Sequence, residues 1–573
     1  MSLTPGQLRA PLFWVLHLEW AGLDWYWATD RTEITTDDGD TIVAESGLAV
    51  SWRQVAELLA VDEVQIALSV GPLTAQAFPH LDIPTMIEEG HDLTGSPCEL
   101  SLWSEGTTWE RRSVKLLARA AMAEYGTNAE GLSFELRPDP VDAGALDPFH
   151  RMRAYGDPEG TGDASFSFDN EQAAGMIAPF VFGRPGIAFG NAVSDGDPGT
   201  IPMRGGSPAV PQLTDPASQL RTTRMIIAQH PVTASSVELV NLTNPGKLSD
   251  LAVSAGTDPD GNVISNVTVT HSTPGALYSG YEAARADTVW CNWMNDDVTS
   301  TGGGFPSRYY AGKELRGAGE LILEMLRRGQ IAHDGAAWEG IRQRLDVYRF
   351  DGFINEPVGA LEWLRQEVFP LLPLSVAAGP SGLFPVLWQP GQPDEAAVRH
   401  LYGTEDGGSL SRLSGPFIRD SHIANEFEIA YKPRSDEQGH AGRLILTGRE
   451  LRQTTTTSNT SDLASRSLVR QSSTLRRSVT RFGLRRDETI ASNFIYDDQT
   501  ARKIIGWRSE LLSAPWREVV YGCERADASL TAGDLVLLTD SELALSSRQA
   551  WVRAVEWRDT QPVIHLLLIP EGA

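Results

Sequence analysis

Asn425-Glu426-Phe427-Glu428-Ile429-Ala430-Tyr431 alternates polar and apolar residues over seven positions. Side chains along a strand point to opposite faces in turn, so this period of two is typical of a β-strand with one buried face. Residues 64–70 repeat the alternation, and the apolar stretch 13–20 predicts a further strand. Together these patterns favour a mainly β fold.

Helical spacing of apolar residues is confined to a few segments. We expect helices at residues 315–328, 338–345, 357–371 and 498–512. The fold class is therefore mainly β (α+β) with a few short helices. A chain of 573 residues corresponds to three to five domains. We expect an N-terminal β domain at 1–140, a loop-rich β domain at 141–300, a mixed α/β domain at 301–420, and a C-terminal β-barrel-like domain at 421–573.

The chain is strongly acidic, with 48 Lys and Arg against 75 Asp and Glu and a net charge of −27. Such a balance argues against stable nucleic-acid binding and against an anionic membrane surface, both of which need a cationic face. Residues 1–150 hold 24 of the acids and only 8 of the bases. This region forms either a solvated acidic surface or an acidic face turned toward a partner or a channel.

Targeting and cysteine patterns add two expectations. The sequence has no apolar run of about 18 residues and no basic, apolar leader at its start, so we expect a protein made in a cytoplasm without a membrane anchor. Cys98, Cys291 and Cys523 lie far apart and belong to no Cys/His cluster. We expect three isolated thiols and neither a zinc site nor a disulfide scaffold.

No motif in the sequence gives a strong indication of a catalytic, phosphate-binding or metal-binding site. Gly302-Gly303-Gly304 lacks the Lys-Ser/Thr of a phosphate-binding loop and predicts a turn. His91 beside Asp92, and His422 near Asp420, are more typical of solvated or capping residues than of acid–base pairs. The segment 258–262, Asp-Pro-Asp-Gly-Asn, opens like a calcium loop but lacks the later Glu ligand, which favours a turn.

An arginine-rich tract stands out in this acidic chain. It contains Arg466, Arg470, Arg476, Arg477, Arg481, Arg485 and Arg486. Arg470, Arg477 and Arg481 fall on one face of the expected helix. Only Phe482 supplies an interleaved aromatic ring, so a solvated face or a salt-bridge surface between subunits is favoured over a nucleic-acid site. We predict no catalytic, cofactor-binding or metal-binding residue, and hence a structural or binding protein.

The residues nevertheless resemble one family, the tail hub (baseplate hub, tail-tip) proteins of long-tailed bacteriophages and gene transfer agents. In the C-terminal half the likeness rests on residues 359–364, 369–374, 382–388 and 425–431 and on the closing run 498–507, 515–521, 532–540 and 550–557. In the N-terminal part it rests on residues 28–31, 46–48, 106–110 and 179–185. It is a likeness of strands and turns and includes no catalytic signature.

This resemblance implies a homotrimer with two tube-like β-barrel domains per protomer, which together form a pseudo-sixfold ring. The implied partners are the distal tail protein, the tail tube and tape measure protein, and tail-tip or fibre proteins. DNA would touch the channel only transiently during ejection. The implied location is the tail tip of a virion assembled in the cytoplasm of a bacterial host.

Two other classes of function stay open. One is a tail-associated cell-wall or glycan hydrolase, which needs a cleft holding carboxylates of displaced pKa. The other is a receptor- or carbohydrate-binding module.

Overall fold

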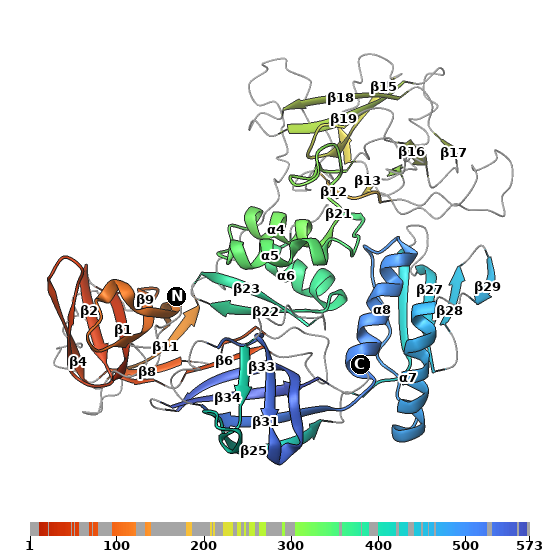
Figure 1. The fold of residues 1–573 in the computed structure, drawn as a ribbon. Helices are drawn as coiled ribbons and strands as arrows, with labels where there is room; N and C mark the ends of the chain where they lie inside the picture. The colour runs from red at the N-terminus through yellow and green to blue at the C-terminus, as the bar shows by residue number, and fades with distance from the viewer. Residues whose placement is uncertain are drawn as a thin grey trace, which may run out of the picture.

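Figure 1 shows the computed structural model, in which sheets surround a small helical layer. The structure describes residues 11–20, 22–46, 48–50, 52–56, 68–70, 73–77, 94–121, 132–138, 179–185, 207–208, 210–212, 222–232, 238–241, 246–247, 251–257, 263–270, 289–292, 304–354, 358–379, 381–388, 399–419, 423–433, 440–448, 451–455, 458–462, 466–523, 530–558 and 561–569. Within these ranges strands predominate, which confirms the mainly β fold.

The N-terminal sheet has nine strands in the order β3-β4-β2-β1-β9-β10-β11-β8-β5. Their bounds are β1 Leu12–Trp20, β2 Leu23–Ala28, β3 Thr32–Thr35, β4 Thr41–Ser46, β5 Ala49–Val50, β8 Leu73–Ala77, β9 Pro97–Ser104, β10 Ser113–Ala121 and β11 Leu132–Pro138, and a 3₁₀ turn, η1, spans Trp109–Arg111. The central strand β1 pairs antiparallel with β2 and β9. Trp14, Leu16 and Leu18 lie in one buried cluster, and Val15 is buried in a second cluster that includes Trp103.

Two four-stranded sheets follow, ordered β13-β20-β16-β17 and β14-β15-β19-β18. Their strands are β13 Ser207–Pro208, β14 Val210–Gln212, β15 Thr222–Ala228, β16 Glu238–Asn241, β17 Gly246–Lys247, β18 Leu251–Thr257, β19 Val263–Thr270 and β20 Val289–Asn292. A separate pair, β12 Phe180–Phe182 with β21 Gly352–Ile354, leads into the helical layer.

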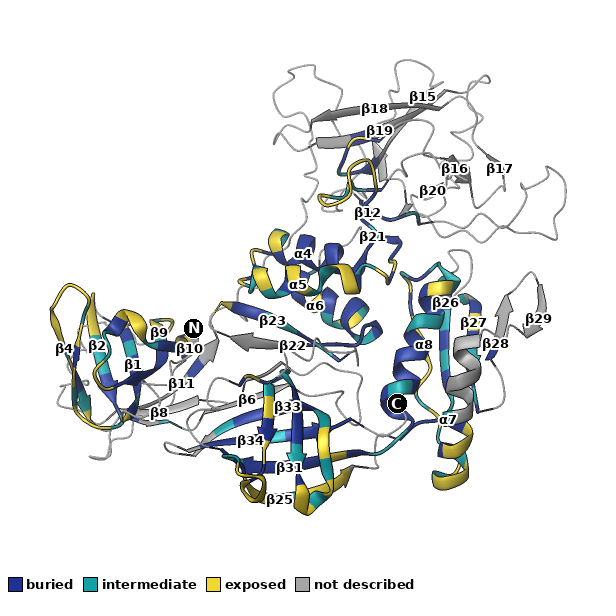
Figure 2. Ribbon diagram, in the orientation of Figure 1, coloured by how far each residue is buried: buried dark blue, intermediate teal, exposed yellow. Residues whose placement is uncertain are grey.

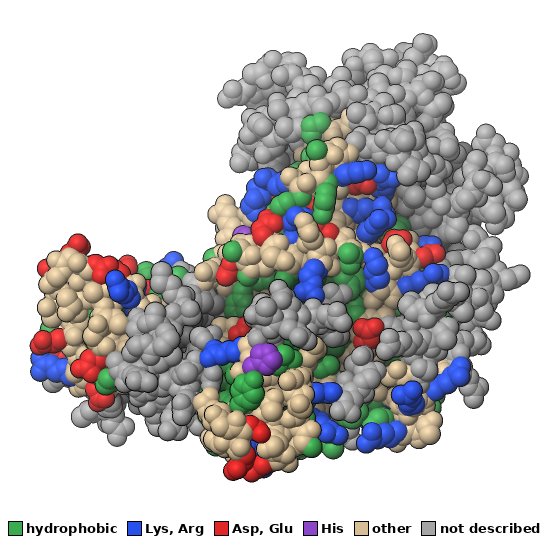
Figure 3. All heavy atoms as spheres, viewed as in Figure 1, with side chains coloured by type: hydrophobic (Ala, Val, Ile, Leu, Met, Phe, Trp, Pro, Cys, Tyr) green, Lys and Arg blue, Asp and Glu red, His purple; other side chains and the backbone are tan. Residues whose placement is uncertain are grey.

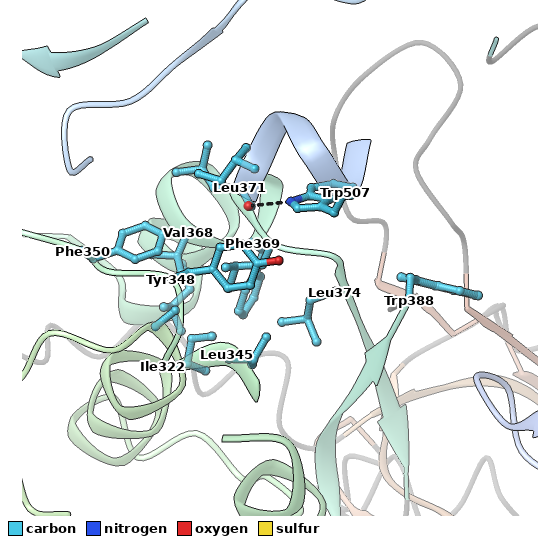
Figure 4. Packing of buried hydrophobic residues seen from close by; sticks show 14 of the residues in the cluster. Ile322, Leu345, Tyr348, Phe350, Val368, Phe369, Leu371, Leu374, Trp388 and Trp507 are labelled. Carbon is cyan, nitrogen blue, oxygen red and sulfur yellow. Dashed lines mark hydrogen bonds between the residues drawn. The ribbon is translucent and has the colours of Figure 1, made fainter. Parts of the chain in front are cut away.

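The helical layer contains α4 Ala318–Arg328, α5 Gly335–Leu345 and α6 Ala360–Trp363. The chain continues from α6 through a π turn, η6 Leu364–Val368, and a 3₁₀ turn, η7 Phe369–Leu371, into the hairpin β22 Leu374–Gly379 and β23 Gly382–Leu387. Apolar side chains from all these elements pack together, and the indole of Trp507 donates a 3.2 Å hydrogen bond to the Leu371 carbonyl (Figure 4).

The C-terminal strands form a half-barrel in the order β24-β32-β33-β34-β31-β25, with β6 and β7 added at β33. The bounds are β6 Trp52–Ala56, β7 Leu68–Val70, β24 Arg399–Tyr402, β25 Ser411–Arg419, β31 Trp516–Gly522, β32 Leu535–Asp540, β33 Leu545–Arg558 and β34 Gln561–Leu568; short 3₁₀ turns lie at η8 Thr404–Asp406 and η10 Ser541–Leu543. The outer strands β24 and β25 are consecutive in the chain, and a bridge between Gly403 and Leu410 links their near ends.

A five-stranded sheet, β29-β28-β27-β26-β30, lies beside two helices. Its strands are β26 Phe427–Pro433, β27 His440–Leu446, β28 Leu451–Thr455, β29 Ser458–Asp462 and β30 Ile490–Ala491, and the helices are α7 Arg466–Phe482 and α8 Asp498–Leu512. Helix α8 packs on β26 and β27, and α7 packs on α8. Asp497 caps α8 by accepting hydrogen bonds from the amides of Gln499 and Thr500.

These sheets join segments that the sequence assigned to different domains. Strand β6, from the expected domain 1–140, pairs with β33, and β12, from 141–300, pairs with β21. Strands β24 and β25, from 301–420, belong to the half-barrel. Buried residues, dark blue in Figure 2, continue through the half-barrel and the helical layer. One buried apolar cluster also links the N-terminal sheet with the half-barrel.

The turn after β12 is locked by close packing. Gly183 has a positive φ of 63°, and a Cβ there would lie 2.5 Å from the Phe350 carbonyl oxygen. The next amide, of Arg184, donates a 2.8 Å hydrogen bond to Asp351. The Arg184 guanidinium also lies 2.6 Å from Glu314. The turn Gly183-Arg184-Pro185 therefore fastens β12 to the helical layer.

We predict that Gly183→Ala destabilises the protein by about 3 kcal/mol or more, because the added Cβ meets backbone and the φ angle is strained. Gly106→Ala is the matched control: Gly106 also has a positive φ, of 80°, but a Cβ there meets nothing within 4 Å. It should cost about 1 kcal/mol. Urea unfolding of both variants measures the difference, and equal losses would show that packing at Gly183 is not the cause.

Candidate functional site

A loop covers the outer side of α4 and α5, and we call residues 304–315 the strap. Four consecutive residues of the strap each contact a different carboxylate of the two helices or of the turn after α5. The pairs are Ser307 with Glu320, Arg308 with Glu324, Tyr309 with Glu339, and Tyr310 with Asp346. The first two residues thus reach α4 and the last two reach α5 and the turn after it, so the strap fixes the two helices relative to each other.

Local hydrogen bonds shape the strap before it meets the helices. The Ser307 hydroxyl accepts from the amides of Tyr309 at 3.1 Å and Tyr310 at 2.9 Å, a turn that serine favours. The Lys313 carbonyl accepts from the Ser307 amide at 2.8 Å and closes the loop. Because both lone pairs of the Ser307 hydroxyl face amides, its proton is directed to Glu320.

A cavity of about 260 Å³ lies beneath the strap. Its lining includes the apolar side chains of Phe305 and Leu323 and the carboxylates of Glu320, Glu324 and Glu339. Glu320 and Glu324 lie one turn apart on α4 and are only 2% and 4% exposed. Buried carboxylates are unusual, and each needs partners to offset its lost hydration.

Glu324 has those partners in three arginines. Nitrogens of Arg308, Arg327 and Arg328 lie 3.0, 2.5 and 2.8 Å from its oxygens. Burial opposes its ionisation, but the hydrogen bonds from Arg327 and Arg328 outweigh burial and lower its pKa. Glu324 is therefore a fixed negative charge.

Glu320 behaves in the opposite way. Burial, with the nearby carboxylate of Asp346, raises its pKa to about 7, against the hydrogen bond from Ser307 and the charge of Arg342. Two carboxyl groups with opposite pKa shifts at one cavity are the arrangement that acid–base catalysts use. Both carboxyl groups, however, already interact with side chains of the strap: Ser307 donates a hydrogen bond to Glu320, and Arg308 pairs with Glu324. The same arrangement therefore also holds the strap on α4.

A second candidate site is a surface on the half-barrel. Among the described strands, β25 pairs on one side only, with β31, and register shifts interrupt that pairing. Leu413, Phe417 and Ile418 on β25 are 51%, 53% and 62% exposed, and we call these three residues the apolar strip. Large apolar side chains on an edge strand are typical of contact surfaces.

The residues singled out from the sequence are divided between the described ranges and the rest of the chain. His91, Asp92, Asp420, His422, Gly302, Gly303 and the segment 258–262 lie outside the described residues. The third glycine, Gly304, packs against the backbone of Gly183. Cys98 and Cys523 are buried free thiols, and burial raises the pKa of Cys98 to about 12.

The arginine-rich tract does contain a helix, α7, as expected. Arg477 and Arg481 are exposed one turn apart near its C-terminal end. Arg476 instead donates to the carbonyl oxygen of Gly448 and holds the helix to its sheet. The side chain of Arg470 lies outside the described residues, so only part of the predicted face can be placed.

Sequence reasoning missed two groupings. One is the buried pair Glu320 and Glu324 on α4. Two glutamates four positions apart within an otherwise apolar helix could have indicated it. The other is on the β1–β2 hairpin, where ligand atoms of His17, Glu19 and Asp24 lie within 4.8 Å of one another. The β1–β2 register places Glu19 opposite Asp24. His17 is already bonded to Asp24 at 2.8 Å and stacked on Tyr26, so we assign it a structural role.

Comparison with known proteins gives no relative. No protein-family model matches the chain. No curated protein matches it either. Among the described helices, none has the length and apolar character needed to span a membrane.

We predict that Glu320→Gln changes how stability depends on pH. The folded state holds the Glu320 proton more tightly than the unfolded chain, whose carboxyl has a pKa near 4.5. Wild-type stability should therefore fall as pH rises from about 4.5 to above 7, by up to about 3 kcal/mol from this group. The glutamine cannot ionise, so the variant gains on wild type as pH rises.

Urea unfolding at pH 5.5 and 8.5 tests this, with Glu405→Gln, an exposed carboxylate on η8, as the control. A stability difference between Glu320→Gln and wild type that is the same at both pH values would contradict the prediction.

Proposed function

We propose that this protein is a structural hub of a phage-type tail, in a bacteriophage or a gene transfer agent. Three copies form a ring at the end of the tail tube. The ring joins the tube, with its tape measure protein, and the distal tail ring to tail-tip or fibre proteins. It is assembled in the cytoplasm of a bacterial host, becomes part of the virion, and surrounds the channel through which DNA is ejected.

The apolar strip is the observation that carries this proposal. A lone copy leaves Leu413, Phe417 and Ile418 in water, although burying such a side chain contributes about 1.5–3 kcal/mol. Phe417 and Ile418 are neighbours on a strand, so apolar groups face both sides of β25. The strip lies on the side of the half-barrel away from the helical layer (Figure 1). Such an exposed apolar surface is expected in a protein that assembles with other subunits.

Charge also supports the proposal. The acidic residues 19, 24, 105 and 110 of the N-terminal sheet are all exposed. An acidic wall repels DNA and keeps it from adhering during passage. Contact with DNA would then be brief, in agreement with the acidic balance of the whole chain.

One observation favours a second candidate, a cell-wall or glycan hydrolase. The cavity beneath the strap holds Glu320, with a raised pKa, beside Glu324, with a lowered one. We rank it below the hub because both carboxylates have internal partners. Under the hub proposal, the purified protein clears no zone in a peptidoglycan zymogram. Clearing by wild type that Glu320→Gln lacks would favour the hydrolase.

We predict that the purified protein has a solution mass near three times 62.4 kDa, stable on dilution in light scattering. The double variant Phe417→Glu with Ile418→Glu should weaken this association at least about tenfold, because two charged groups would need to be buried. Leu23→Glu is the matched control: Leu23 is 58% exposed on β2, outside the strip. A double variant that remains as associated as Leu23→Glu would show that the strip is not the contact.

A further inference from the structure

The β3–β4 hairpin carries a dense negative charge, and we call Glu33, Asp37, Asp38 and Asp40 the acidic hairpin. All four residues are exposed. Within the described part of the chain, none of their carboxylates forms a salt bridge. Residues 30–46 include six acids and a single arginine. The charge is therefore available to a cationic partner.

The acidic hairpin is rigid. The Thr36 amide donates to the Asp40 carbonyl at 2.9 Å, and the Gly39 amide donates to the Thr36 carbonyl at 3.0 Å. Ile34 anchors the hairpin in a buried cluster that includes Trp103. A rigid charged surface loses little conformational entropy on docking, which favours specific contact.

The opposite charge gathers at α7. Residues 466–486 contain seven arginines and no acid. Arg477 and Arg481 are exposed on one face, and no described carboxylate pairs with either guanidinium. We call these two residues the basic face. The sequence pattern already favoured a solvated face or a salt-bridge surface between subunits here over a nucleic-acid site.

The two surfaces lie at opposite ends of the molecule. The β3–β4 hairpin is at the left of Figure 1 and α7 at the right. In Figure 3, Asp and Glu side chains predominate over the left end, and Lys and Arg side chains lie over the lower right. Because a hairpin so far from α7 cannot reach it in the same copy, the partner must be another molecule.

We propose that the acidic hairpin of one copy docks on the basic face of the next copy. Contacts between different surfaces of identical subunits run head to tail, and they close into a ring when the rotation between subunits fits. The inference rests on the proposed ring and identifies its lateral contact. A nucleic acid is disfavoured as the occupant of the basic face, because the rest of this −27 chain repels a polyanion. The charges set the order and register of the copies, and the apolar strip adds buried area.

The test is a charge swap, read by light scattering across a dilution series at 50 and 500 mM NaCl. We expect wild type to associate at 50 mM and to weaken at 500 mM, since salt screens exposed charges. Arg477→Glu with Arg481→Glu should weaken association at least about tenfold at 50 mM NaCl. So should Asp37→Lys with Asp38→Lys. The fourfold variant that combines all these changes restores opposite charges and should recover most of the loss.

Arg344→Glu, an exposed position on α5, is the control for charge reversal, and circular dichroism checks that each variant folds. If wild type associates but neither reversal weakens it, or if the fourfold variant fails to recover, the inference is wrong while the hub proposal stands. If wild type stays monomeric at 50 mM NaCl at every concentration, the inference is wrong and the proposed self-assembly loses its support as well.

Discussion

Strand β33 holds the described parts of this molecule together. Along its first half it pairs with β32, and over Ala554–Trp557 it pairs with β6, a strand from the start of the chain. Its other edge pairs with β34. Trp551, between the two halves, contacts Trp388 of the helical layer edge-on at 5.0 Å and stacks on Trp516 at 5.4 Å. The half-barrel, the N-terminal segment and the helical layer therefore all depend on one strand being correctly paired.

Buried charges give the helical layer its specific geometry. Arg184 pairs with Glu314, Arg316 with Asp351, and Arg308 with Glu324, and the first of these pairs joins segments 130 residues apart. The intact pairs contribute little net stability, but a buried carboxylate that loses its partner is costly. The pairs therefore act mainly by destabilising wrong arrangements of the strap. The apolar strip and the acidic hairpin are different: the strip is exposed, and among the described residues no carboxylate of the hairpin forms a salt bridge.

Local patterns predicted local structure well and long-range pairing poorly. The strand predicted at 425–431 overlaps β26, and the helix predicted at 498–512 is α8. Both were predictable because the spacing of apolar residues can be read within one continuous stretch of sequence. The helix expected at 357–371 is wrong as a single α-helix: it is one turn of α-helix followed by π and 3₁₀ turns. The strap contacts were also not predictable, since Glu320 acquires its partner and its raised pKa only in the folded chain. The tail hub stays a prediction from resemblance.

The pairing of β6 with β33 also imposes an order on biosynthesis. About 500 residues separate the two strands, which at about 5–20 residues per second is an interval of roughly 25–100 s on the ribosome. Until β33 emerges, β6 and β32 lack the strand that joins them, and the half-barrel cannot form. A copy whose synthesis stops early therefore presents no finished half-barrel. Formation of the half-barrel therefore requires that the chain has been synthesised at least as far as β33.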